Sequence, residues 1–272
     1  MILLHVADAA LYALAAWTVW PVHESREATR GAPGARSTAS IALLAAALLL
    51  HAWLAWQGVA TPEGLDLSLA NAVSVVAGLV AAVAWGSGLL ATLPVIGTVV
   101  LPVAAVATLL PLVLTNPHRF AYAGESLAAA HVAVALVSYA LFLVAALQAL
   151  VLMGLEKRLH RRLLDPGAAD LPPLLTLERF LFRLITAGFV LLTLTLGSGM
   201  LFTEQLFGKP FTLTHKSVFS VLGWLTFGAL LWGRWRYGWR GRVALRWIIA
   251  GTVLVFLAYL GSKFVVEVLL GR

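Results

Sequence analysis

The chain has 272 residues, of which 61% are hydrophobic and 11% are charged, whereas an ordinary globular domain has about 45–50% apolar and about 25% charged residues. A soluble protein of this length could not bury so much apolar surface, and the lack of cysteine excludes disulfide frameworks and thiolate chemistry. The net charge of +7 is explained by basic cytoplasmic loops rather than by a nucleic-acid partner. We therefore predict an all-α, polytopic membrane helical bundle that forms one integral membrane domain over residues 1–272.

Eight apolar stretches are long enough to span a bilayer, which takes about 20 predominantly apolar residues. In chain order they cover residues 2–20, 38–56, 67–89, 93–114, 127–155, 180–202, 215–231 and 243–270. The first has no basic leader, so we interpret it as a retained helix and not as a signal peptide. Only the short segment GSGLLATLP separates the third stretch from the fourth. If those two merged, every later helix would reverse its orientation.

The basic residues favour eight transmembrane helices with both termini on the extracytoplasmic side. In this arrangement most of the 19 Lys and Arg residues fall on the cytoplasmic side, including those of the run GRWRYGWRGRVALRW. The sequence has no Walker loop, nucleotide-binding glycine fingerprint, HExxH or GxSxG motif, and we expect no enzyme. The expected location is the bacterial inner (cytoplasmic) membrane, with the lipid bilayer around a multi-pass chain.

Three of the seven histidines lie where an imidazole is informative. His51 lies deep inside the second stretch, and His131 lies one turn into the fifth. A polar ring at these depths is costly unless it faces the bundle interior and finds a partner. A structural hydrogen bond is the alternative for both. His215 opens the seventh stretch, where capping of the helix by Thr214 or an interfacial position is the alternative. The remaining histidines are interpreted as solvated or interfacial, namely His5, His23, His118 and His160.

The pairing of His131 with His215 favours a ligand site. Both residues enter the membrane from the same side, at the beginnings of helices that run in the same direction. Side-by-side packing of those helices would bring the two rings level. Two facing imidazoles can supply the axial ligands of haem iron, so we expect non-covalent haem b with His131 and His215 as metal ligands. His51 marks a second or transit site, and Met200 is an alternative ligand.

Other polar residues in the apolar stretches have a structural interpretation. Asn71 and Gln148 are expected to form hydrogen bonds between helices, each contributing about 0.6 kcal/mol. Lys263 and Glu267 are four residues apart near the end of the last stretch, so they are expected to form a local ion pair.

Several segments match a known family in order along the chain. The segment AAAHVAVALVSYALFLVAALQALVL is similar to a family helix of pattern H-V-x(5)-S-Y-A, and LLLHAW followed by LSLANAVSVVAGLVAAVAW is similar to its early histidine-bearing region. The chain thus resembles the integral membrane cytochrome c assembly family of the CcsA and CcmC type, closest to its shorter YpjD/HemX-like branch. The resemblance implies that His131 and, more weakly, His51 bind haem. The segment KPFTLTHKSVF lacks the tryptophans and aspartate of the family's external loop, so His215 would substitute for a lost ligand.

The expected function is haem binding or handling during cytochrome c assembly or haem homeostasis, with haem and other cytochrome-assembly or membrane proteins as partners. An alternative implied by the resemblance is an accessory or regulatory membrane protein without haem, which controls tetrapyrrole synthesis or assists an ion-transport system. A small-molecule or ion transporter is disfavoured, because the apolar stretches contain no carboxylates apart from Asp8 and Glu267 near their ends, and no pair of interrupted helices is visible in matching halves.

Overall fold

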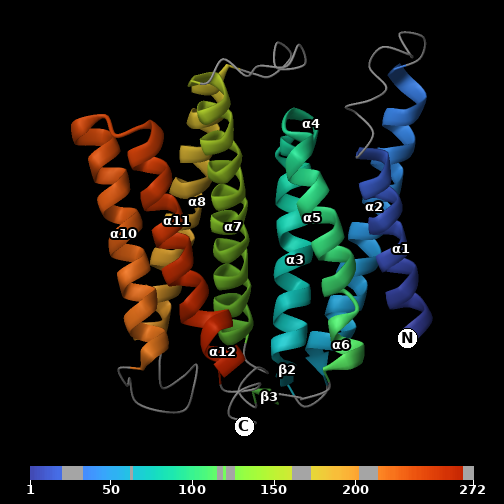
Figure 1. Cartoon of the computed structure of the whole chain (residues 1–272). Coiled ribbons are helices and arrows are strands. Elements are labelled where there is room, and N and C mark those ends of the chain that lie inside the picture. The colour runs from blue at the N-terminus through green and yellow to red at the C-terminus, as the bar shows by residue number, and fades with distance from the viewer. Residues whose placement is uncertain are drawn as a thin grey trace. The chain divides into compact units, whose positions relative to one another are not determined.

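The computed structural model describes residues 1–19, 33–61, 64–114, 119–120, 126–160, 173–201 and 214–265 (Figure 1). Nearly all of them are helical, as the all-α prediction requires. They form two compact units, which are described separately. The prediction of a single membrane domain stays a prediction.

The first unit contains the N-terminal helices. Its elements are α1 (Ile2–Val19), α2 (Pro33–Val59), β1 (Ala60–Thr61), α3 (Leu69–Gly86), α4 (Leu89–Thr92), α5 (Pro94–Ala107) and α6 (Leu110–Val113). Helix α1 packs against both α2 and α5. The fully buried side chains of this unit include Tyr12, Leu54 and Leu101.

Helices α3 and α5 are separate elements, as predicted. Gly88 adopts a left-handed conformation with φ of 75° between α3 and α4, which a residue without Cβ adopts without strain. Pro94 then occupies the first turn of α5, where its missing N–H costs nothing. Pro102 lies inside α5 and is tolerated, as expected for a packed membrane helix.

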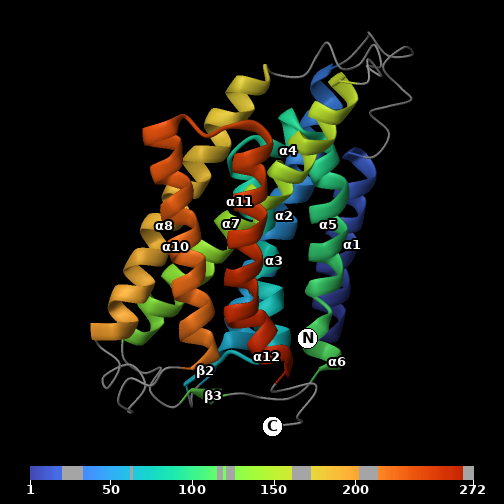
Figure 2. The same cartoon turned by 60° about the vertical axis from the view of Figure 1, so that its left-hand side comes forward.

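The second unit is a four-helix bundle. Its elements are β2 (Gly64–Asp66), β3 (Arg119–Phe120), α7 (Ser126–His160), α8 (Leu174–Leu201), α10 (His215–Tyr237), α11 (Gly241–Phe256), η4 (Leu257–Gly261) and α12 (Ser262–Phe264). Successive helices run in alternating directions (Figures 1 and 2). Around the bundle, α7 packs against α8 and α11, and α10 packs against the same two helices. Helices α7 and α10 are therefore diagonal partners.

Two aromatic rings fill the centre of this bundle. Phe142 of α7 stacks on Phe227 of α10, with ring centroids 3.9 Å apart and an interplanar angle of 7°. Glycines of the flanking helices leave the space for them. A Cβ on Gly188 of α8 would lie 2.9 Å from Phe142, and a Cβ on Gly251 of α11 would lie 2.9 Å from Phe227. Each ring thus packs directly against the backbone of a neighbouring helix.

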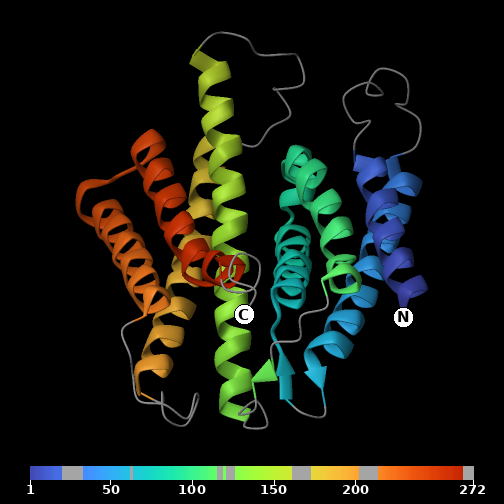
Figure 3. The same cartoon turned by 60° about the horizontal axis from the view of Figure 1, so that its bottom comes forward.

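Strands β2 and β3 of this unit lie beside the beginning of α7 (Figure 3). Strand β2 pairs antiparallel with β3, with Leu65 opposite Phe120. The buried side chain of Lys263, in α12, donates a hydrogen bond to the carbonyl oxygen of Leu67. The end of the last described helix is thereby attached to the segment that follows β2. Glu267, the expected ion-pair partner of Lys263, lies outside the described residues.

Both interhelical hydrogen bonds expected from the sequence are present. Asn71 Nδ2 donates to the carbonyl oxygen of Gly58 at 3.1 Å, and Gln148 Nε2 donates to that of Leu177 at 2.8 Å. The predicted cap of α10 is also present, because Thr214 Oγ1 accepts from the backbone N–H of Ser217.

The prediction of eight spans is confirmed in part. Seven helices in the described ranges are long and apolar enough to cross a membrane, and the N-terminal helix Ile2–Thr18 is shorter. At about 1.5 Å per residue, a helix of that length covers slightly less than the roughly 30 Å of a bilayer core. The orientation of the chain, with both termini on the extracytoplasmic side, stays a prediction.

Candidate functional site

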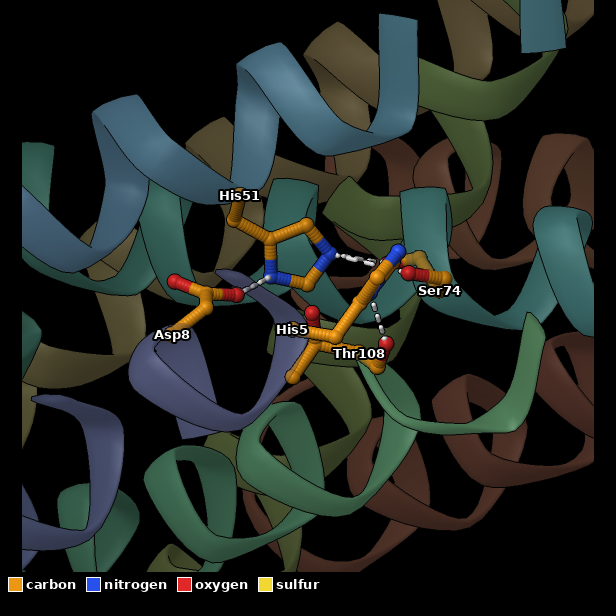
Figure 4. Close-up of polar contacts among 5 residues, drawn as sticks. All are labelled: His5, Asp8, His51, Ser74 and Thr108. Carbon is orange, nitrogen blue, oxygen red and sulfur yellow. Dashed lines mark hydrogen bonds and ion pairs between the residues drawn. The ribbon is translucent and has the colours of Figure 1, made fainter. Parts of the chain in front are cut away.

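The most extensive buried polar cluster of the first unit surrounds His51 (Figure 4). His51 is 2% exposed. Its Nε2 lies 3.0 Å from the carbonyl oxygen and 3.1 Å from the hydroxyl oxygen of Ser74 on α3. Its Nδ1 lies 3.4 Å from Oδ2 of Asp8 on α1. Three helices therefore contribute to one Asp–His–Ser arrangement.

Asp8 and Tyr12 reach this cluster because they are one helical turn apart on the same face of α1. Both are fully buried. The Tyr12 ring contacts His51 edge-on, with centroids 5.6 Å apart. Among the described residues, the Tyr12 hydroxyl and the two oxygens of Asp8 make no hydrogen bond, so the contact of Asp8 with His51 is an ion pair without hydrogen-bond geometry. Such orphaned buried polar atoms are rare and call for an explanation.

His5 extends the cluster toward a cavity. Its Nδ1–H donates to the carbonyl oxygen of Thr108, at the end of α5, over 2.6 Å. A cavity of about 70 Å³ is lined by His5, Ser74 and Asn71 together with Gln57, Gly58 and others. A polar cavity of this size can hold water, so the cluster has a polar neighbour on the Ser74 side.

The packing of the His51 ring leaves little room for a further ligand. A Cβ on Gly78 of α3 would lie 3.1 Å from ring atoms of His51. Both ring nitrogens already face protein groups, and Ser74 occupies the Nε2 side. A haem iron could reach His51 only if Ser74 or Asp8 moved away. This geometry fits the hydrogen-bonded alternative better than the expected transit site.

His131 has a different environment in the second unit. It is half-buried on α7, and its Nδ1 lies 2.8 Å from Oγ of Ser198 on α8. When the Ser198 hydroxyl donates to the carbonyl oxygen of Thr195, 3.1 Å away, its oxygen accepts from Nδ1–H of His131. The lone pair of the neutral ring is then on Nε2. Histidines that bind metals commonly have this arrangement, with a fixed hydrogen bond at the other nitrogen.

His215 is exposed at the first position of α10. Helices α7 and α10 begin at the same end of the bundle and run in the same direction (Figure 1), as predicted. The expectation that they pack side by side is wrong, because each of them packs mainly against α8 and α11, and they meet across the bundle centre where Phe142 stacks on Phe227. Parallel direction alone does not fix the order of helices around a bundle. His131 has a hydrogen-bond contact with Ser198 of α8.

Sequence reasoning missed two members of the His51 cluster. His5 was interpreted as interfacial, but it is 8% exposed, and Asp8 was placed near a helix end, but it is fully buried. The signal that could have found them is the spacing of His5, Asp8 and Tyr12, which places all three on one face of a helix. Of the other peripheral histidines, His23 and His118 lie outside the described residues, and His160 ends α7.

The long apolar helices and the buried polar side chains define a multi-pass helical membrane protein. Residues 39–270 match the family of cytochrome C assembly proteins, and the chain belongs to that family. It is 34% identical over 237 residues to the inner membrane protein YpjD of Escherichia coli, covering 85% of this chain and 86% of YpjD. This similarity also supports the expected location in the inner membrane.

Two further relatives match shorter regions. An uncharacterised 28.8 kDa protein of Azospirillum brasilense is 36% identical over 141 residues, which is 52% of each chain. The cytochrome c biogenesis protein CcsA of Prochlorococcus marinus is 33% identical over 85 residues, covering 31% of this chain and 27% of CcsA. No solved structure matches the chain.

Proposed function

We propose that this membrane protein binds haem b non-covalently, through His131, in the course of cytochrome c assembly or haem homeostasis. The observation that carries the proposal is the hydrogen bond between His131 Nδ1 and Ser198 Oγ. It orients a half-buried imidazole near the end of the bundle, and the tautomer with its proton on Nδ1 would make Nε2 the basic nitrogen. Membership of the cytochrome c assembly family supports the choice of haem as the ligand.

The residues of the second unit suit haem better than those of the first. Imidazole and thioether are among the side chains that bind haem iron axially, and His131, Met200 and His215 all belong to the end of the bundle where α8 ends and α10 begins. Haem bound there would supply an iron that imidazole nitrogens can ligate. His131 is the proposed inner ligand and exposed His215 the proposed second ligand. We leave His51 out of the ligand set, because both of its ring nitrogens face protein groups.

The proposed role of the chain is to hold haem and not to catalyse a reaction. Ser198 fixes the orientation of the imidazole, and the apolar helices around His131 limit the access of water. The proposed partners are haem, the lipid bilayer and other proteins of cytochrome assembly. The extracytoplasmic position of this end of the bundle is part of the same proposal and follows from the distribution of basic residues.

The test is the haem content of the full-length protein purified in detergent, measured as the pyridine haemochrome per chain. We expect bound haem in the wild type, a large loss in His131→Ala and a further loss in the His131→Ala, His215→Ala double variant. Thr193→Val is the matched control. It removes a side-chain hydrogen bond between α8 and α10, from Trp224 to Thr193, without removing a ligand group.

An unchanged haem content in a correctly folded double variant would overturn the proposed ligands. A wild type without haem, expressed with an ample haem supply, would overturn haem binding itself. That second result would favour the alternative of an accessory or regulatory membrane protein.

A further inference from the structure

We propose that Asp8 and His51 form a proton-binding site inside the first unit, and that its single proton exchanges with the neighbouring cavity through Ser74. The proposal concerns the helices α1, α2 and α3 and is independent of haem binding by the second unit. It rests on the side-chain geometry around His51 (Figure 4).

The charge balance of the pair is the first step. Asp8 is fully buried, His51 Nδ1 forms an ion-pair contact of 3.4 Å with its Oδ2, and the Thr108 side chain lies beside the same carboxylate. An ionised carboxylate beside a neutral imidazole would leave one uncompensated buried charge, which is strongly unfavourable. One added proton, on the carboxyl or on the ring, makes the pair neutral overall. The pair is therefore built to hold a proton.

The two oxygens of Ser74 allow the ring to change its tautomer without moving. The hydroxyl oxygen, 3.1 Å from Nε2, can donate when Nε2 carries a lone pair. The carbonyl oxygen, 3.0 Å from the same nitrogen, can only accept, and it does so when Nε2 carries a proton. Both protonation states of Nε2 are thus satisfied by the same heavy-atom positions, whereas Nδ1 has only the 3.4 Å ion-pair contact with Asp8.

Proton uptake can be written as a balanced transfer. In the empty state Asp8 is ionised, His51 carries its proton on Nδ1, and the Ser74 hydroxyl donates to Nε2. A hydronium ion in the cavity gives a proton to Ser74 Oγ and becomes water, while the hydroxyl proton moves to Nε2. The Nδ1 proton moves to Asp8 Oδ2, which requires these two atoms to approach from 3.4 Å. The loaded state has a neutral Asp8 that donates to Nδ1 and a ring that carries its proton on Nε2. Release reverses these steps.

The groups around the Asp8–His51 pair favour proton exchange on the Ser74 side. The cavity of about 70 Å³ touches Ser74 and His5, so a water file can reach the hydroxyl. The other titratable side chains that face the pair are those of His5 and Tyr12 on α1. Met1, which carries the α-amino group, lines the same cavity. The groups of α3 and α5 beside the cluster are Asn71, Ser74 and Thr108, which do not titrate.

The experiment follows the protonation of both partners in full-length protein reconstituted in lipid vesicles. Infrared difference spectra between acid and alkaline buffers detect a protonated carboxyl. Among the carboxyl bands we expect one that is lost in Asp8→Asn and kept in Asp66→Asn, which removes a half-buried carboxylate that accepts from the backbone N–H of Ser68. Ser74→Ala is expected to slow hydrogen–deuterium exchange of this band several-fold, and Ser74→Thr, which retains a hydroxyl, is expected to restore it.

Nitrogen-15 spectra of histidine-labelled wild-type protein keep the proposal testable if Asp8→Asn does not fold. We expect the His51 tautomer to change over the pH range in which the carboxyl band changes. One unchanging tautomer, or a carboxyl signal that is indifferent to Asp8→Asn, would overturn the proposal. Spectra that respond to sodium at constant pH would overturn it in favour of a cation site. His131→Ala should leave every one of these signals unchanged, which separates this test from that of haem binding.

Discussion

The rings of Phe142 and Phe227 stack at 3.9 Å across the diagonal of the four-helix bundle. They come from helices whose other principal contacts are to α8 and α11, so this stack is a direct link between the diagonal pair. Both side chains are almost completely buried. The cohesion of the second unit should therefore depend strongly on this contact.

Phe142→Ala is expected to destabilise the second unit by about 3–5 kcal/mol, because it opens a cavity at the bundle centre and removes the stacking partner of Phe227. The measurement is thermal unfolding of the full-length protein in detergent. Phe256→Ala, on α11, is the control, because Phe256 is 42% exposed and should change the unfolding temperature little. Equal effects of the two variants would contradict the assigned role of the stack.

Gly78→Val is expected to displace the His51 ring, because a Cβ at this position already lies 3.1 Å from its atoms. The displacement should weaken the contacts of His51 with Ser74 and Asp8 together. It is measured from the nitrogen-15 chemical shifts of His51. Gly86→Val is the matched control on the same helix, since a Cβ at Gly86 would have nothing within 4 Å. An unshifted His51 signal in Gly78→Val would show that the ring tolerates the added bulk.

Ser198→Ala is expected to lower haem affinity by about 10-fold to 100-fold, the usual effect of removing a group that orients a metal-binding histidine. Haem titration of the purified apoprotein measures the affinity. Ser198→Thr, which retains a hydroxyl, should bind haem more tightly than Ser198→Ala. The same affinity in the alanine and threonine variants would show that the hydrogen bond to His131 does not orient a ligand.

Arg234→Gln is expected to destabilise the opposite end of the second unit by about 1–3 kcal/mol. Arg234 Nη1 donates to Glu178 Oε1 at 2.8 Å and to the carbonyl oxygen of Trp239 at 3.1 Å. The guanidinium also lies 4.4 Å from the ring centroid of Phe182. Arg236→Gln is the control, because the contact recorded for Arg236 is the ring of Tyr237 at 5.7 Å. Thermal unfolding distinguishes the two, and indistinguishable curves would contradict the prediction.

The sequence predicts the helices well and their lateral order poorly. Long apolar runs locate nearly every helix, and the segment around Gly88 and Pro94 separates α3 from α5 because both residues have strong backbone preferences. The order around the bundle is not encoded in the same way. In an apolar helix, the lipid-facing and protein-facing sides have similar hydrophobicity. Side-by-side packing of α7 and α10 was therefore inferred from direction alone and was wrong.

The sequence identifies a site residue where burying that residue in an apolar helix is by itself unfavourable in free energy. His51 and His131 stand out because an imidazole among apolar residues needs a partner. Asp8 is not among the predicted site residues, because its position near the end of an apolar stretch was equated with exposure. Burial depends instead on the helices that pack over it, and α2 and α5 both cover α1. Ser74 gave no signal, since a lone serine is common in membrane helices.

The glycines opposite the aromatic stack have an evolutionary consequence. Gly188 abuts Phe142 and Gly251 abuts Phe227, so side-chain volume at each glycine is limited by the ring that faces it. A larger residue at 188 becomes acceptable only where 142 has become smaller, and the same holds for 251 and 227. Homologous sequences should therefore show covariation within these two couples, and a Phe142→Leu change should offset part of the damage caused by Gly188→Ala.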